Sequence, residues 1–170
     1  MLLISTRLRY SILALLVIAS HSKDKALPLK TIAQTLGLSL KYLEKIFRLL
    51  KKGGFVRATR GASGGYILAK PPEEITIYEL TLILEGKTLA VECLDKEIFC
   101  QKRGLCPEQI LWKDLQTIIN NFLKAQTLKL LLANTTSASL KIHSQISKKR
   151  SLQLKTSNRG GKNGKALCLS

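Results

Sequence analysis

The sequence predicts a mainly α-helical protein with one small β-hairpin, organised as a winged helix-turn-helix followed by a long dimerisation helix. Three observations support this prediction. Apolar residues recur at helical spacing before residue 53, they alternate with polar residues on both sides of a glycine-rich turn, and helical spacing returns after residue 107. Helix, short turn, helix and hairpin, in that order, are the elements of a winged helix-turn-helix.

The helices before the hairpin are expected at residues 5–20, 29–36 and 40–52. Gly37 follows the second helix, and a glycine there can adopt the left-handed conformation that ends many helices. Ser39 precedes the third helix and can cap its first turn with its side-chain oxygen. The turn between these two helices is therefore predicted to be only a few residues long.

The hairpin is expected to pair a strand over residues 55–60 with a strand over residues 66–70. Residues 61–65, Gly-Ala-Ser-Gly-Gly, supply the tight turn between them. Because the order is strand, turn, strand rather than strand, turn, helix, these glycines do not form a phosphate-binding loop. The hairpin is therefore interpreted as the wing.

After the hairpin, a capping box of Thr76 and Glu79 predicts a helix that ends at Gly86. A long helix is predicted over residues 108–125, and Thr127 is expected to cap a last short helix that ends at residue 132. The apolar residues of the long helix alternate spacings of four and three, which is typical of a coiled-coil seam. They are Leu111, Leu115, Ile118, Phe122 and Ala125.

This pattern divides the chain into four parts. We expect a DNA-binding winged helix-turn-helix domain at 1–86, a cysteine-bearing loop at 87–107, a dimerisation helix at 108–133 and a basic, disordered tail at 134–170.

The formal net charge is +17 and is distributed unevenly. Residues 1–70 hold 13 Lys and Arg against 2 Asp and Glu, residues 71–114 hold 5 against 9, and residues 115–170 hold 10 against none. A basic first block favours nucleic acid as the partner, although a solubilising surface would have the same composition. The longest apolar run, residues 12–19, has eight residues and is too short to span a membrane.

The third helix places basic residues at spacings of four, three and four, so that they share one face. They are Lys41, Lys45, Arg48 and Lys52. Such a face can contact phosphates and guanine edges, and the alternative is an ordinary solvated helix face. Glu44 is the one acidic residue between residues 25 and 70, and we expect it to accept a hydrogen bond from a cytosine amino group. Arg60, beside the wing tip, is expected to enter a minor groove.

Cys93, Cys100 and Cys106 cluster in one irregular, charged segment, whereas Cys168 lies in the tail and is expected to have no role. The gaps of six and five residues do not match the paired spacing of a structural zinc site, and no histidine is near. Thiolates are the usual ligands of iron–sulfur clusters. The alternative is that the cysteines are small buried hydrophobic residues.

Several of these segments resemble the Rrf2 family of bacterial winged-helix regulators. They are Arg9-Tyr10, LSLKYLEKIFRLLKKGGFV at 38–56, RGASGGYILAK at 60–70, the three cysteines and Leu111-Trp112. The resemblance covers residues 1–132 and implies a homodimer, in which the long helix crosses to its partner, bound to a palindromic operator. It places base-reading residues at Ser39, Tyr42, Glu44 and Lys45, with Arg60 in the wing.

In cluster-bearing members of that family, three cysteines before the long helix hold the cluster, and they correspond to Cys93, Cys100 and Cys106. Known fourth ligands are a histidine after the last cysteine or an aspartate before the tyrosine of the first helix. The corresponding residues here are Gln109 and Arg9. The fourth ligand therefore stays open.

These observations predict a transcription regulator, not an enzyme, that binds double-stranded DNA as a homodimer and carries a [2Fe-2S] cluster. It is expected in a bacterial-type cytoplasm, or in the stroma of an organelle, without membrane association. Three alternatives remain: the cysteines form a thiol redox switch or zinc site, the chain is a basic RNA-associated protein, or it is an iron–sulfur electron carrier or enzyme subunit.

Overall fold

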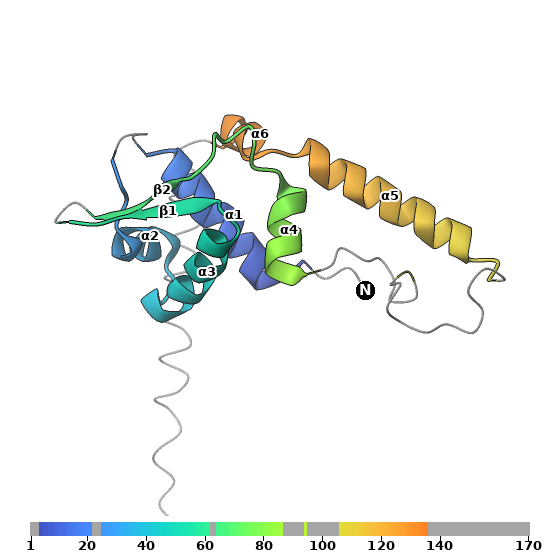
Figure 1. Ribbon diagram of the computed structural model, residues 1–170, viewed down its shortest axis with the longest axis horizontal. Coiled ribbons are helices and arrows are strands. Elements are labelled where there is room, and N and C mark those ends of the chain that lie inside the picture. The colour runs from blue at the N-terminus through green and yellow to red at the C-terminus, as the bar shows by residue number, and fades with distance from the viewer. Residues whose placement is uncertain (1–3, 22–24, 62–63, 87–93, 95–105, 136–170) are drawn as a thin grey trace, which may run out of the picture.

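The computed structural model describes residues 4–21, 25–61, 64–86, 94 and 106–135. The described elements are α1 (Thr6–Ala19), α2 (Leu29–Leu36), α3 (Leu40–Lys52), β1 (Val56–Thr59), β2 (Gly65–Leu68), α4 (Ile77–Glu85), α5 (Gln109–Ala125) and α6 (Leu128–Ala133). The first four helices, the hairpin and α6 form one body, from which α5 projects as a rod (Figure 1). The mainly helical winged-helix fold predicted from the sequence is confirmed.

The core of this body is formed by one apolar face of each helix. Leu15 of α1, Ile32 of α2, Phe47 of α3 and Leu80 of α4 are almost fully buried. Leu128 of α6 is also buried in this core, so the last helix packs back onto the N-terminal body. Burying side chains of this size stabilises the fold by about 1.5–3 kcal/mol each.

The turn between α2 and α3 has the predicted chemistry. Gly37 adopts the left-handed conformation, with φ of 66°, and the backbone N–H of Leu38 donates to the Ala33 carbonyl at 3.0 Å. The Ser39 side chain accepts a hydrogen bond of 3.3 Å from the backbone N–H of Tyr42. These bonds end one helix and begin the next within three residues, 37–39.

The wing is an antiparallel hairpin in which Val56 pairs with Leu68 and Thr59 with Gly65. Its strands, β1 and β2, are shorter than the predicted 55–60 and 66–70, and Arg60 lies just beyond β1. On its other edge β2 bridges Leu27, which donates to and accepts from Tyr66 at 3.0 and 2.9 Å. A Cβ at position 65 would lie 2.5 Å from the Leu27 carbonyl, so this close approach requires glycine.

Thr76 caps the start of α4, as predicted, and the backbone beside it pairs with the segment between α5 and α6. The Thr76 hydroxyl accepts from the Glu79 N–H at 3.2 Å, as a capping box predicts. Glu79 Oε2 is buried and has no hydrogen-bond partner among the described residues, so this oxygen does not make the reciprocal bond of a capping box. Instead the backbone here pairs with the α5–α6 junction: Ile77 N–H donates to Gln126 and Leu128 N–H to Ile75, both at 2.9 Å.

Among the described residues, no helix is both long and apolar enough to cross a membrane.

Candidate nucleic-acid interface

Helix α3 separates a buried face from a basic one. Leu43, Ile46, Phe47 and Leu50 are at most 1% exposed. The predicted stripe and its acidic neighbour all lie on the exposed side; they are Lys41, Glu44, Lys45, Arg48 and Lys52. Because the apolar face is anchored in the core, the basic face is held at the surface in a fixed orientation.

These cations are available for phosphate. Within the described ranges, the one ion pair joins Arg7 to Glu85, and no lysine or arginine of α3 or of the wing takes part in one. Arg57 and Arg60 are both exposed along the hairpin. Glu44 is the one acidic residue between residues 25 and 70, so basic side chains outnumber acidic ones on α3 and the hairpin and favour a polyanionic partner.

The predicted reader Ser39 is exposed, although its oxygen already serves as the N-cap of α3. Tyr42 is half-buried and packs edge-on against Tyr10 of α1, with ring centroids 6.1 Å apart. Burial, followed by the charges of Tyr10 and Glu85, raises the pKa of Tyr42, while Arg7 opposes the shift. The phenol therefore stays protonated near neutral pH and can donate a hydrogen bond.

The wing tip and the long helix occupy different ends of the molecule. The hairpin extends beyond the body on the side of α2 and α3, and α5 leaves the body on the opposite side (Figure 1). This arrangement separates the candidate DNA surface from the surface offered by α5.

Helix α5 exposes most of its predicted seam. Leu111, Ile118 and Phe122 are 60–65% exposed, and Leu115 is 38% exposed. On the opposite face Gln116 is buried and donates to Asn120 Oδ1 at 2.8 Å, and nearer the body Lys124 lies 5.0 Å from the Tyr78 ring centroid of α4. A row of large apolar side chains is therefore left facing solvent in the single chain.

Of the cysteines, only Cys106 lies in the described part of the chain, as a half-buried free thiol just before α5. Its carbonyl accepts from the Gln109 N–H at 3.2 Å. Cys93 and Cys100 lie outside the described residues, as does Cys168. The described residues by themselves contain no group of three metal-binding side chains, and a thiolate at Cys106 has the chemistry of an iron–sulfur ligand.

The structure also brings together three residues that the sequence analysis did not connect. Glu85, the last residue of α4, accepts from the Ser5 hydroxyl and from Arg7 Nη2, the latter at 3.4 Å. We call Ser5, Arg7 and Glu85 the α1–α4 clasp. The partners are about 80 positions apart, so no local pattern marks them.

Comparisons with known proteins agree with this geometry. Residues 4–134 match the Rrf2 family, described as iron-dependent transcriptional regulators. The chain is 37% identical to the HTH-type transcriptional regulator IscR of Photorhabdus laumondii over 126 residues, covering 74% of this chain and 76% of that protein. It is 35% identical to Protein rrf2 of Nitratidesulfovibrio vulgaris over 130 residues, covering 74% and 87%.

Solved structures show the same likeness. The cysteine regulator CymR of B. subtilis superposes with a TM-score of 0.66 at 34% identity, covering 80% of this chain and all of that one. IscR of T. potens superposes with a TM-score of 0.62 at 32% identity, covering 81% and 90%. These relatives are transcription regulators rather than enzymes. The chain therefore belongs to the Rrf2 family of winged-helix transcriptional regulators.

Proposed function

We propose that this regulator binds palindromic operators as a homodimer and that an iron–sulfur cluster on Cys93, Cys100 and Cys106 controls this binding. The observation that carries the proposal is the pairing of two surfaces on one chain: the unpaired basic face of α3 with its wing, and the exposed apolar row of α5. We place this activity in a bacterial-type cytoplasm or an organelle stroma.

The apolar row supports the homodimer. Ridges spaced four and three residues apart fit the same ridges of a second helix, and large contiguous apolar surfaces are usually covered. A two-fold dimer would present two α3 helices to successive turns of the DNA, so its operator would be palindromic. The base-reading residues proposed are Ser39, Tyr42, Glu44 and Lys45, with Lys41 and Arg48 on phosphate and Arg60 in the minor groove.

The donor chemistry supports the cluster. Three thiolates suit iron, and they leave one position for a non-cysteine ligand, which fits a [2Fe-2S] cluster that is readily lost. When bound, the cluster would join the three cysteine thiolates to one another through its iron atoms. α4 ends at Glu85 and α5 begins at Gln109, three residues after Cys106, so segment 87–107 joins the proposed DNA-binding body to the proposed dimer helix. A ligand that changes this segment can therefore change how the two recognition helices are placed.

The α1–α4 clasp supports a connection to the recognition helix. Glu85 at the end of α4 is bonded to α1, and α1 contacts α3 through Tyr10 and Tyr42. Displacing the end of α4 would therefore disturb the packing around Tyr42, at the N-terminal end of α3.

Anaerobic purification and reconstitution test the cluster, followed by measurement of iron, sulfide and the visible spectrum. We expect iron and sulfide in equal amounts, and loss of the chromophore on replacing any one of Cys93, Cys100 and Cys106 by alanine. Cys168→Ala is the matched control and should retain it. Stoichiometric zinc without iron or sulfide would contradict the proposal.

A thiol redox switch is the second candidate. It is favoured by the free, half-buried Cys106 thiol and by the likeness to CymR, for which an oxidized form of the Staphylococcus aureus protein has been solved. Thiol-reversible loss of operator binding in iron-free protein would support it.

A further inference from the structure

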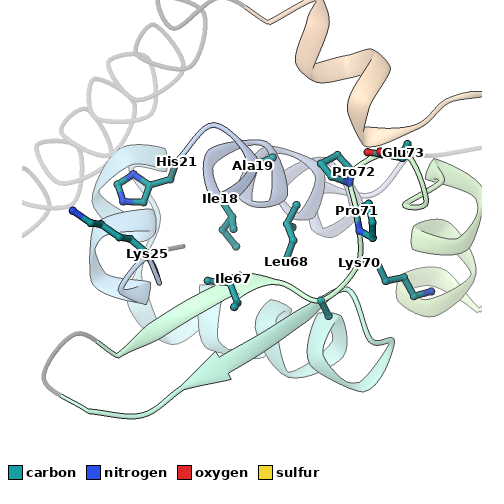
Figure 2. A pocket seen from close by; sticks show the side chains of 11 residues that line it. Ile18, Ala19, His21, Lys25, Ile67, Leu68, Lys70, Pro71, Pro72 and Glu73 are labelled. Atoms are coloured by element: carbon teal, nitrogen blue, oxygen red, sulfur yellow. The ribbon is translucent and has the colours of Figure 1, made fainter. Parts of the chain in front are cut away.

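A cavity lies on the body away from the basic face of α3. It has a volume of about 350 Å³ and is bounded by the end of α1, by β2 and by the segment that follows β2 (Figure 2). The described residues that line it are Ile18, Ala19, His21, Lys25, and residues 67–73, and none of them belongs to α3 or is Cys106. Within the described part of the chain, the cavity is therefore separate from α3 and from Cys106.

The middle of the cavity is apolar. Ile18 and Leu68 occupy the centre, Ile67 borders it on β2 with its side chain directed away from Leu68, and Pro71 and Pro72 form the wall toward one end (Figure 2). At about 30 Å³ per water-sized group, this volume accommodates about a dozen heavy atoms. Cavities of this size with apolar walls and a few polar groups are typical of small-molecule sites, and covering the walls would release water from apolar surface.

The charged groups lie at the two ends. His21 and Lys25 lie together at one end, whereas Glu73 lies beyond the prolines at the other (Figure 2). Lys70 contributes its stem, but its ammonium points away and lies 5.8 Å from the centre of the Phe55 ring. An anionic group is therefore favoured beside Lys25 and disfavoured beside Glu73. The strongly basic block at residues 1–70 adds a field that attracts anions and repels cations.

We propose that this cavity binds a small monocarboxylate with an apolar body. The carboxylate lies beside Lys25 and His21, and the apolar body lies along Ile18 and Leu68 and ends before Glu73. Because the site involves neither α3 nor the cysteines, this inference stands or falls independently of cluster binding.

Methyl NMR of the full-length protein tests this with octanoate as the probe. We expect saturable shifts of the Ile18 and Leu68 methyl groups. Octanol, which lacks the charge, should bind at least about tenfold more weakly, equivalent to about 1.4 kcal/mol. Octylamine, which reverses the charge, should not saturate the site. Equal binding of octylamine and octanoate, or no saturable shift of these methyl groups, would overturn the proposal.

Two charge variants test where the carboxylate lies in the cavity. Lys25→Glu should weaken octanoate binding at least about tenfold, whereas Lys30→Glu, an exposed lysine on α2 outside the cavity, is the matched control and should not. Glu73→Lys should leave octanoate binding intact or strengthen it. Equal loss in Lys25→Glu and Lys30→Glu would show a general effect of net charge and contradict a carboxylate position at Lys25.

Discussion

Helices α3 and α5 have similar amphipathic sequences but different partners. In α3 the apolar residues Leu43, Ile46, Phe47 and Leu50 are buried in the body that contains the helix, and the basic face is exposed, where we propose that it contacts DNA. In α5 the apolar row is 38–65% exposed, and the only buried residue on the helix is the polar Gln116. An apolar stripe on a helix therefore predicts that the helix will be covered, and the spacing of the stripe and its neighbouring segments indicate whether its own domain or another chain covers it.

The largest expected effect is on stability and comes from truncating a side chain on the buried face of α3. Phe47→Ala removes a ring that is 1% exposed and packs 4.5 Å from the Tyr66 ring, so we expect a loss of about 3–5 kcal/mol in unfolding free energy. Urea unfolding measures it. Phe122→Ala is the matched control because that ring is 62% exposed in the single chain. Phe122→Ala should lower the unfolding free energy mainly by weakening dimerisation, so its effect should depend on protein concentration. A loss equal to that of Phe47→Ala at every protein concentration would contradict the assignment of Phe122 to the dimer surface.

Breaking the exposed face of α5 should leave the fold and remove the dimer. Replacing Leu115 and Ile118 together by aspartate puts charges in the seam, and sedimentation should then show monomers with an unchanged helical circular-dichroism signal. Asn121→Asp adds a charge to an exposed polar position of the same helix and should remain dimeric. Persisting dimers with intact operator binding would show that the seam is misassigned.

Smaller effects are expected on the polar face of α3 and on the wing. Lys45→Ala and Arg60→Ala should each weaken operator binding by about 1–3 kcal/mol, because each removes a charged contact to a base edge or groove. Lys129→Ala, an exposed lysine on α6, should change binding little. Binding isotherms at one fixed salt concentration measure this, and an equal loss in all three variants would indicate only a net-charge effect.

Glu44→Ala should have the smallest effect on affinity and a distinct effect on specificity. Removing this carboxylate relieves repulsion of phosphate, so binding to a scrambled duplex should hold or tighten while discrimination against it falls. Titrations on operator and scrambled duplexes measure the ratio. An unchanged ratio would exclude Glu44 as a base reader.

The elements that the sequence predicted well depend on neighbouring residues. Gly37 and Ser39 mark the turn before α3 because helix-ending and helix-capping bonds join residues only a few positions apart. The α1–α4 clasp and the bridge from Leu27 to Tyr66 were not predicted, since each joins segments distant in the chain. The spacing of Thr76 and Glu79 is also local, but it did not predict that packing would bury one Glu79 carboxylate oxygen without a hydrogen-bond partner among the described residues. Of the predicted site, Cys93 and Cys100 lie outside the described residues.

The backbone hydrogen bonds at the α5–α6 junction hold α5 at one end, so the helix can tilt about that end. Hydrogen bonds from Ile77 to Gln126 and from Leu128 to Ile75 fix its C-terminal end to the body, while Cys106 precedes its opposite end. Seventeen helical residues span about 25 Å, so a tilt of about 10° at the fixed end displaces the far end by about 4 Å. A displacement of about 4 Å near Cys106 therefore requires a rotation of only about 10° at the α5–α6 junction. Conversely, a slight rotation of the body that holds this junction moves the end of α5 near Cys106 by about the length of a side chain.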